Sequence, residues 1–208
     1  MGFRKIACPK KIGEYKMANL FENNTLIVNQ KFTVIANQYQ IQDENGNEIG
    51  FVQENMSTGK KALSLLVSKK IMPFNLSILD AQKNVLATIS RGVTLLLSKT
   101  TIKNANGEEI AKINQKFTML KPKFEIMDIQ GQLIATIQGD WKAWEFSIKS
   151  PDGNEIGTVS KKWGGALKEI FTDSDKYVVN ITGDISENNR IAILSTAVVV
   201  DMILKENN

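Results

Sequence analysis

Basic residues gather at the start of this 208-residue chain, where their chemistry is the binding of anions. The segment FRKIACPKKIGEYK contains Arg4, Lys5, Lys10 and Lys11. Close to an anionic membrane leaflet, each such residue contributes about 1 kcal/mol to binding. The segment therefore predicts either weak docking on an anionic surface, helped by Phe3 and Ile6, or a solvated terminus.

Further basic pairs lie along the chain at Lys60-Lys61, Lys69-Lys70 and Lys161-Lys162, the last followed by Trp163. Lys and Arg together number 26 against 22 Asp and Glu, giving a net charge of +4. This mild excess is compatible with contact to an anionic membrane and gives no argument for nucleic acid. The pairs form one patch only if the fold brings them together.

The sequence contains few of the residue types that commonly act in catalysis. The chain has no histidine, which removes the commonest general base, the Ser/His and Cys/His nucleophile pairs and most zinc sites. Carboxylates, lysines and tyrosines occur without a spacing that indicates an active site. We expect a protein that is not an enzyme and needs no cofactor.

The single cysteine, Cys8, cannot form an internal disulfide. No apolar run precedes it that would act as a signal peptide. Ile6 occupies the place where N-myristoylation requires Ser or Thr. We expect a cytoplasmic, monomeric protein.

A longer pattern repeats once along the chain. The stretch from Val28 to Gly50 returns as Ile113 to Ala135, at a constant offset of 85, with nine of 23 positions identical. The shared NQKFT is difficult to obtain from two unrelated hairpins. We infer an internal duplication and predict that Phe32 and Phe117 both face the interior from equivalent strands.

Smaller units recur within each half: an alternating strand, a polar turn, an apolar residue, a small residue and a second strand. They are YQIQDENGNEIGFV, LSILDAQKNVLATI, TIKNANGEEIAKI, FEIMDIQGQLIATI and FSIKSPDGNEIGTV. Alternation is typical of half-buried strands, and Asx followed three residues later by Gly is typical of type I turns. With flanking runs such as TLIVNQKF, KALSLLVS, TLLLSK and KYVVNIT, the sequence predicts about 10 to 13 strands and a closed barrel.

The least polar stretch is RIAILSTAVVVDMILK, Arg190 to Lys205. As a helix, Ile191 to Leu204 spans roughly 21 Å, less than the ~30 Å of a bilayer core. It is apolar on every face except at Ser195, Thr196 and Asp201. A helix buried in the barrel is favoured over a membrane anchor or a strand pair. Residues 1–16 are then a basic arm, and 17–208 one mostly β domain.

Several motifs gather in the C-terminal part: Gly157 leading to Ser160–Trp163, FTDSD at Phe171–Asp175, GDWKAWEFSI, and the terminal apolar stretch with Asp201. In these motifs the chain resembles the phospholipid scramblases and their LURP-one-related relatives, in the tubby C-terminal-like group. The resemblance implies a barrel of about 12 antiparallel strands around a C-terminal helix, and the 85-residue repeat divides it into two pseudo-repeated halves. The proline-rich arm and cysteine cluster of scramblases are missing.

The same resemblance implies a weak calcium site. In scramblases the segment beginning at FTDSD has been proposed as a calcium loop, which here places Asp173, Asp175 and Asp184 at positions 1, 3 and 12. Val178 stands where such a loop requires glycine. The alternative is a polar turn leading into the strand KYVVNI.

Two functions remain open. The first is a scramblase-like barrel that binds anionic phospholipid at the membrane surface through Arg4, Lys5, Lys10, Lys11, Lys161, Lys162 and Trp163. The second is a structural barrel that binds a protein or small molecule and has no lipid role. For the tryptophans, packing on the barrel competes with contact to lipid headgroups.

Overall fold

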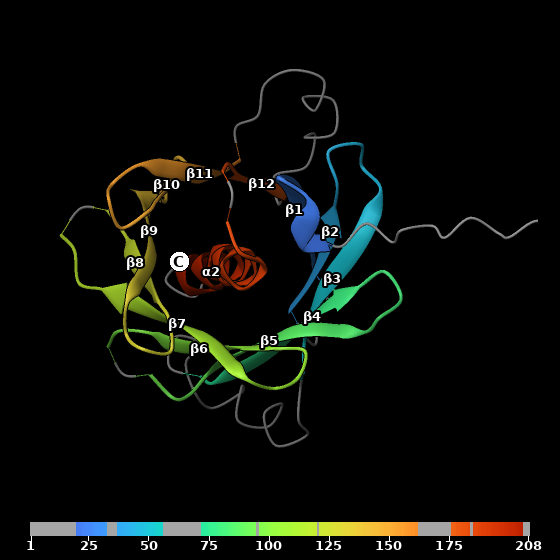
Figure 1. The fold of residues 1–208 in the computed structure, drawn as a ribbon, viewed down its shortest axis with the longest axis horizontal. Helices are drawn as coiled ribbons and strands as arrows, with labels where there is room; N and C mark the ends of the chain where they lie inside the picture. The colour runs from blue at the N-terminus through green and yellow to red at the C-terminus, as the bar shows by residue number, and fades with distance from the viewer. Residues whose placement is uncertain are drawn as a thin grey trace, which may run out of the picture.

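The computed structural model describes residues 20–32, 37–55, 72–94, 96–119, 121–161, 176–183 and 185–205. Twelve strands form a closed antiparallel barrel in which each strand pairs with its chain neighbours and β12 pairs with β1. Seen in Figure 1, the strands form a ring with the helix α2 inside it. The predicted mostly β barrel around a C-terminal helix is confirmed.

A short 3-10 helix, η1 (Leu20–Glu22), leads into the barrel. The strands are β1 (Thr25–Phe32), β2 (Asn37–Gln42), β3 (Glu48–Glu54), β4 (Phe74–Asp80), β5 (Val85–Arg91), β6 (Lys99–Asn104), β7 (Glu109–Lys116), β8 (Lys123–Met127), β9 (Leu133–Asp140), β10 (Glu145–Lys149), β11 (Glu155–Ser160) and β12 (Lys176–Ile181). The helix α2 (Glu187–Lys205) follows. Of the expected flanking strands, Thr94–Lys99 is mostly a connection, and 61–68 lies outside the described residues.

Five hairpins share one register, which explains the recurring unit in the sequence. Each places a buried isoleucine opposite a buried glycine or alanine: Ile41–Gly50, Ile78–Ala87, Ile102–Ala111, Ile126–Ala135 and Ile148–Gly157. The pairing shifts by one residue directly after each isoleucine. Large and small side chains thus alternate around the inner wall, which fills the interior densely while leaving room for α2.

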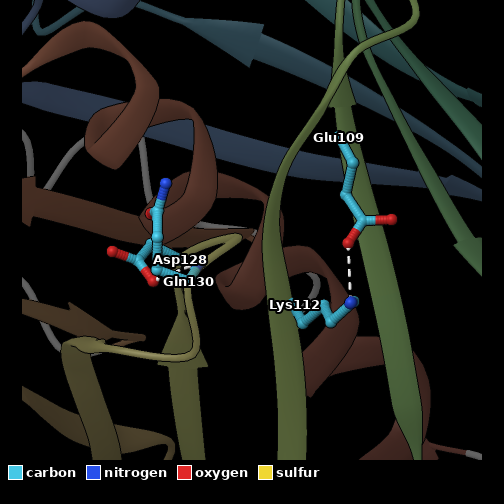
Figure 2. A network of polar contacts seen from close by, with 4 residues as sticks. All are labelled: Glu109, Lys112, Asp128 and Gln130. Atoms are coloured by element: carbon cyan, nitrogen blue, oxygen red, sulfur yellow. Dashed lines mark hydrogen bonds and ion pairs between the residues drawn. The ribbon is translucent and has the colours of Figure 1, made fainter.

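The predicted turns are confirmed. Gly46, Gly107 and Gly131 have φ between 81° and 83°, and each donates its N–H to the carbonyl of the Asx residue three positions earlier. Figure 2 shows the β8–β9 turn, where the Asp128 Oδ1 accepts the N–H of Gln130 at 2.9 Å, near the exposed Glu109–Lys112 ion pair at 2.8 Å. Side-chain acceptors and positive-φ glycines therefore fix the hairpin lengths.

The duplication appears in the strand pairing. Val28 lies opposite Ile41 and, 85 residues later, Ile113 lies opposite Ile126. β1 and β7 are six places apart in the ring of twelve, on opposite walls. The prediction for Phe117 is wrong: it follows the last residue of β7 and is 81% exposed. The side chain of Phe32 lies outside the described residues.

α2 is buried throughout its apolar length. The residues from Ile191 to Leu204 are each at most 8% exposed, and α2 lies against β6 to β9, β12 and η1. Among the described residues, no helix is long and apolar enough to cross a membrane. The apolar stretch is therefore the core of the barrel, as predicted.

One buried carboxylate belongs to this core. The Tyr39 hydroxyl on β2 donates to Asp201 Oδ2 on α2 at 2.9 Å, and all three of Asp201, Tyr39 and Tyr177 are 0% exposed. Burial, and then the charge of Asp201, raise the pKa of both phenols well above its usual value. This bond joins α2 to β2 inside the barrel.

Val199→Asp tests the helix as the core. An unpaired buried carboxylate costs several kcal/mol, a large share of the 5–15 kcal/mol that stabilises a typical domain. Val199 is 0% exposed, so we expect the variant to lose its cooperative thermal transition by circular dichroism. Val93→Asp, at a side chain 71% exposed, is the control and should melt as the wild type does. Equal melting of both variants would contradict a buried helix.

Alkaline pH should destabilise the barrel. Because the two phenols have raised pKa values when folded, their contribution to stability is complete below about pH 10 and is lost as pH rises through the folded-state values. In a Tyr15→Phe variant, only Tyr39 and Tyr177 report as tyrosines. We expect tyrosinate absorbance to appear together with unfolding. Titration near pH 10 with the fold intact would contradict this.

Candidate functional site at the loop end of the barrel

The two ends of the barrel are built differently. Because neighbouring strands run antiparallel, alternate connections lie at the same end. The five hairpin turns after β2, β4, β6, β8 and β10 form what we call the turn end. The connections after β1, β3, β5, β7, β9 and β11 form the loop end, and the C-terminal residues of α2 reach it.

Charge is divided between these ends. Around the turn end, Asp43, Glu44, Glu48, Asp80, Glu108, Glu109, Asp128, Asp152, Glu155 and Glu187 outnumber Lys83, Lys103, Lys112, Lys149 and Arg190. Around the loop end, the basic residues Lys31, Arg91, Lys99, Lys116, Lys121, Lys123, Lys142, Lys161 and Lys176 outnumber the acidic residues Glu54, Glu125, Asp140 and Glu145. Within the part of the chain that the structure describes, the barrel therefore has one acidic and one basic end. Such a distribution orients a protein in an external field.

Some of the loop-end lysines have acidic partners. Glu125 forms ion pairs with Lys116 at 2.9 Å and with Lys123 at 3.3 Å. Slight burial raises the pKa of Glu125, but these two lysines outweigh it and hold the pKa below its usual value. Lys121 and Lys142 are both exposed at the rim of the same region.

A groove of about 360 Å³ opens at the loop end. Its apolar wall is formed by Leu97, Phe117, Met119, Pro122, Trp141 and Leu204, with Lys116 and Lys121 among its polar residues. The wall thus combines residues of three connections with the last turn of α2. An apolar floor beside lysines suits a ligand that has both an apolar part and an anionic part.

A second groove, of about 330 Å³, has a polar lining and shares Lys121 with the first. Thr136, Gln138 and Gly139 of β9 and Ser147 and Lys149 of β10 complete it. At Gly139 a side chain would lie 2.0 Å from the carbonyl oxygen of Glu145, so only glycine fits this approach of the two strands. Lys121 is therefore the residue that joins an apolar groove to a polar one.

Of the predicted lipid-contact residues, Lys161 is placed at the loop end, directly after β11. Its Nζ lies 4.7 Å from the centre of the Trp144 ring, which stacks on Tyr177 at 5.5 Å. Trp141 and Trp144 pack against the core. The remaining candidates lie outside the described residues: Arg4, Lys5, Lys10, Lys11, Lys162, Trp163, Asp173, Asp175 and Asp184.

Sequence reasoning missed the exposed apolar residues of the loop end. Leu96 and Met119 are each 92% exposed, and Phe117 is 81% exposed. A signal existed: FTML lies between Lys116 and Lys121-Pro122, after the strand alternation has ended. Within the part of the chain that the structure describes, no group of three or more acidic or cysteine side chains is placed to hold a metal ion.

The chain matches the family model described as Scramblase over residues 6–207. It is 26% identical over 168 residues to the altered inheritance rate of mitochondria protein 25 of Saccharomyces cerevisiae, covering 69% of this chain and 51% of the relative. With a phospholipid scramblase family protein of Schizosaccharomyces pombe, it shares 22% identity over 84% of this chain and 50% of the relative. The chain thus spans about half the length of these two relatives.

Two further comparisons agree. Human phospholipid scramblase family member 5 is 23% identical over 85% of this chain and 69% of its own. The X-ray structure of an Arabidopsis thaliana protein has a similar fold, with a TM-score of 0.52 at 11% identity over 88% of this chain and 92% of that one. Because the family model covers almost the whole chain, the chain belongs to the Scramblase family.

Proposed function

We propose that this protein is a peripheral lipid-binding barrel that docks its loop end on membranes containing anionic phospholipid. The observation that carries the proposal is the division of charge between the two ends. A basic end attracts an anionic leaflet, and an acidic far end is repelled by it, so the two effects favour the same orientation.

The family supports lipid as the ligand class, since several relatives carry the name phospholipid scramblase. The place of α2 limits how this chain binds. Its apolar residues already pack inside the barrel, which leaves the connections and their lysines for lipid contact. The proposed role is binding at the membrane surface, without catalysis.

The basic arm is a proposed second contact, through Arg4, Lys5, Lys10 and Lys11. It leads into η1, which precedes β1 at the turn end. The arm and the loop end therefore join the barrel at opposite ends. The arm is an alternative contact to the loop end, and its contribution is measured separately. Lys161 extends the loop-end contact, and Lys162 and Trp163 are proposed to continue it.

Charge removal at the loop end tests the proposal. Lys121→Ser with Lys142→Ser removes two exposed charges, worth about 1 kcal/mol each, so we expect roughly 30-fold weaker binding to phosphatidylserine-containing vesicles in co-sedimentation. The matched control, Lys83→Asn with Lys103→Ser, removes two charges from the turn end and should bind as the wild type does. Asn suits residue 83 because its φ is 67°.

The outcomes separate the candidate functions. Equal weakening by both pairs would show non-specific attraction and contradict a docking end. No binding to any vesicle would favour the alternative, a barrel that binds a protein or small molecule. A further variant, with the four basic arm residues changed to Ser, measures how much the arm contributes to vesicle binding.

Calcium is a separate part of the proposal, through Asp173, Asp175 and Asp184. Isothermal titration with calcium, with magnesium as the control ion, tests it. We expect the wild type to release or absorb heat when calcium binds, and we expect an Asp173→Asn, Asp175→Asn variant to show no such heat. The absence of heat in the wild type would remove calcium from the proposal, while the vesicle experiment remains valid without it.

A further inference from the structure

Two connections at the loop end expose apolar side chains that could have been buried. Between β5 and β6, Val93, Leu96 and Leu97 are 71%, 92% and 40% exposed. Between β7 and β8, Phe117 and Met119 are 81% and 92% exposed. Single exposed apolar residues are ordinary on protein surfaces, so the significance lies in whether these five form one surface.

Two hydrogen bonds join the β5–β6 connection to the end of β7, where the β7–β8 connection starts. The backbone N–H of Gln115 donates to the Ser98 carbonyl at 2.9 Å, and the Ser98 N–H donates to Gln115 Oε1 at 3.0 Å. Leu97, Phe117 and Met119 line the same groove, together with Trp141 and Leu204. We call the exposed apolar residues of these two neighbouring connections the apolar tip: Val93, Leu96, Leu97, Phe117 and Met119.

The turn end has no equivalent among the described residues. Its exposed large hydrophobics are Val85, at 44%, and Ile129, at 57%, and these belong to two separate hairpins. The contrast between the ends therefore concerns apolar surface as well as charge. The apolar tip lies at the basic end.

We infer that the apolar tip inserts below the headgroups of an anionic bilayer, while the surrounding lysines remain at headgroup level. Lys99, Lys116, Lys121 and Lys142 flank the tip, so apolar side chains project from a basic collar. This matches a bilayer, which presents anionic groups above hydrocarbon. Trp141 lies at the border, in the position where interfacial tryptophans are enriched.

The inference rests on the proposed function and specifies how deeply the loop end enters the bilayer. Attraction by lysines alone is screened by salt, over about 8 Å at physiological ionic strength. Burial of apolar surface is not screened in this way. The two modes therefore differ in salt dependence: an inserted tip leaves residual binding in high salt, and surface attraction does not.

The test uses the full chain and vesicles of phosphatidylcholine with and without phosphatidylserine. Leu96→Ser, Phe117→Ser and Met119→Ser are made singly and together. Burying one such side chain corresponds to roughly tenfold in affinity, so each single variant should bind about tenfold more weakly. The triple variant should also lose the residual binding in high salt. Val85→Ser with Ile129→Ser is the matched control at the turn end and should bind as the wild type does.

A second readout reports depth directly. In a Cys8→Ser background, Met119→Cys carries an environment-sensitive fluorophore, and Ile129→Cys carries the same label in a control protein. On phosphatidylserine vesicles, we expect the label at 119 to shift to the blue and to be quenched by lipids spin-labelled in the acyl chain. The label at 129 should show the emission of a fluorophore in water, both with and without vesicles.

The failures are distinguishable. If the wild type binds anionic vesicles but the label at 119 stays in water and high salt releases all protein, insertion is wrong and surface docking stands. If the wild type binds no vesicle, the proposed function fails, and insertion fails with it. Equal loss of binding by the tip and control variants would also overturn the inference.

Discussion

The closed barrel depends on one requirement: its interior must be filled, and α2 fills it. A ring of twelve strands has no free edge, but an empty interior would expose the apolar face of every strand. The helix supplies apolar side chains on all sides, which a helix on a protein surface would not have. The recurring pairs of isoleucine and a small residue shape the inner wall around it. The Tyr39–Asp201 bond adds a buried polar contact between the helix and the wall.

This requirement also constrains function. A helix that is used as core presents its apolar face to the strands, so membrane contact falls to the barrel surface. The hairpin turns have little freedom, because Asx side chains and positive-φ glycines determine their geometry. At the loop end, the β9–β10 connection uses a similar Asx turn, through Asp140. The described parts of the connections after β5 and β7 have no such turn, and they hold the exposed apolar side chains. The proposed docking surface is thus located where the fold permits variation.

The sequence predicted the fold well because the relevant patterns are local and repeated. Alternation, the Asx–Gly turns and the 85-residue repeat each identify strands without knowledge of the rest of the chain. Phe117 shows the limit. Phe32 and Phe117 occupy the same place in the two NQKFT segments, but β7 ends at Lys116. One residue beyond the strand pairing, a side chain is no longer directed to one face of the sheet, and Phe117 is exposed.

The loop end was less predictable for a similar reason. Leu97, Phe117, Trp141 and Leu204 line one groove although they are far apart in sequence, and only strand order around the ring brings them together. The buried bond between Tyr39 and Asp201 likewise joins residues that are 162 positions apart in the sequence. The lysines can be read from the sequence. Their position at one end of the barrel depends on the strand directions, because every second connection lies at the same end.

Hydrogen exchange measured by mass spectrometry, with the protein free and bound to phosphatidylserine vesicles, tests most directly whether α2 remains the core while the loop end docks. Exchange reports local opening, so a helix packed inside a barrel exchanges slowly in both states. The expected result is unchanged slow exchange for residues 191–204, with new protection in the peptides covering 92–98 and 117–122. Faster exchange of 191–204 on binding, or new protection confined to the turn end, would contradict it.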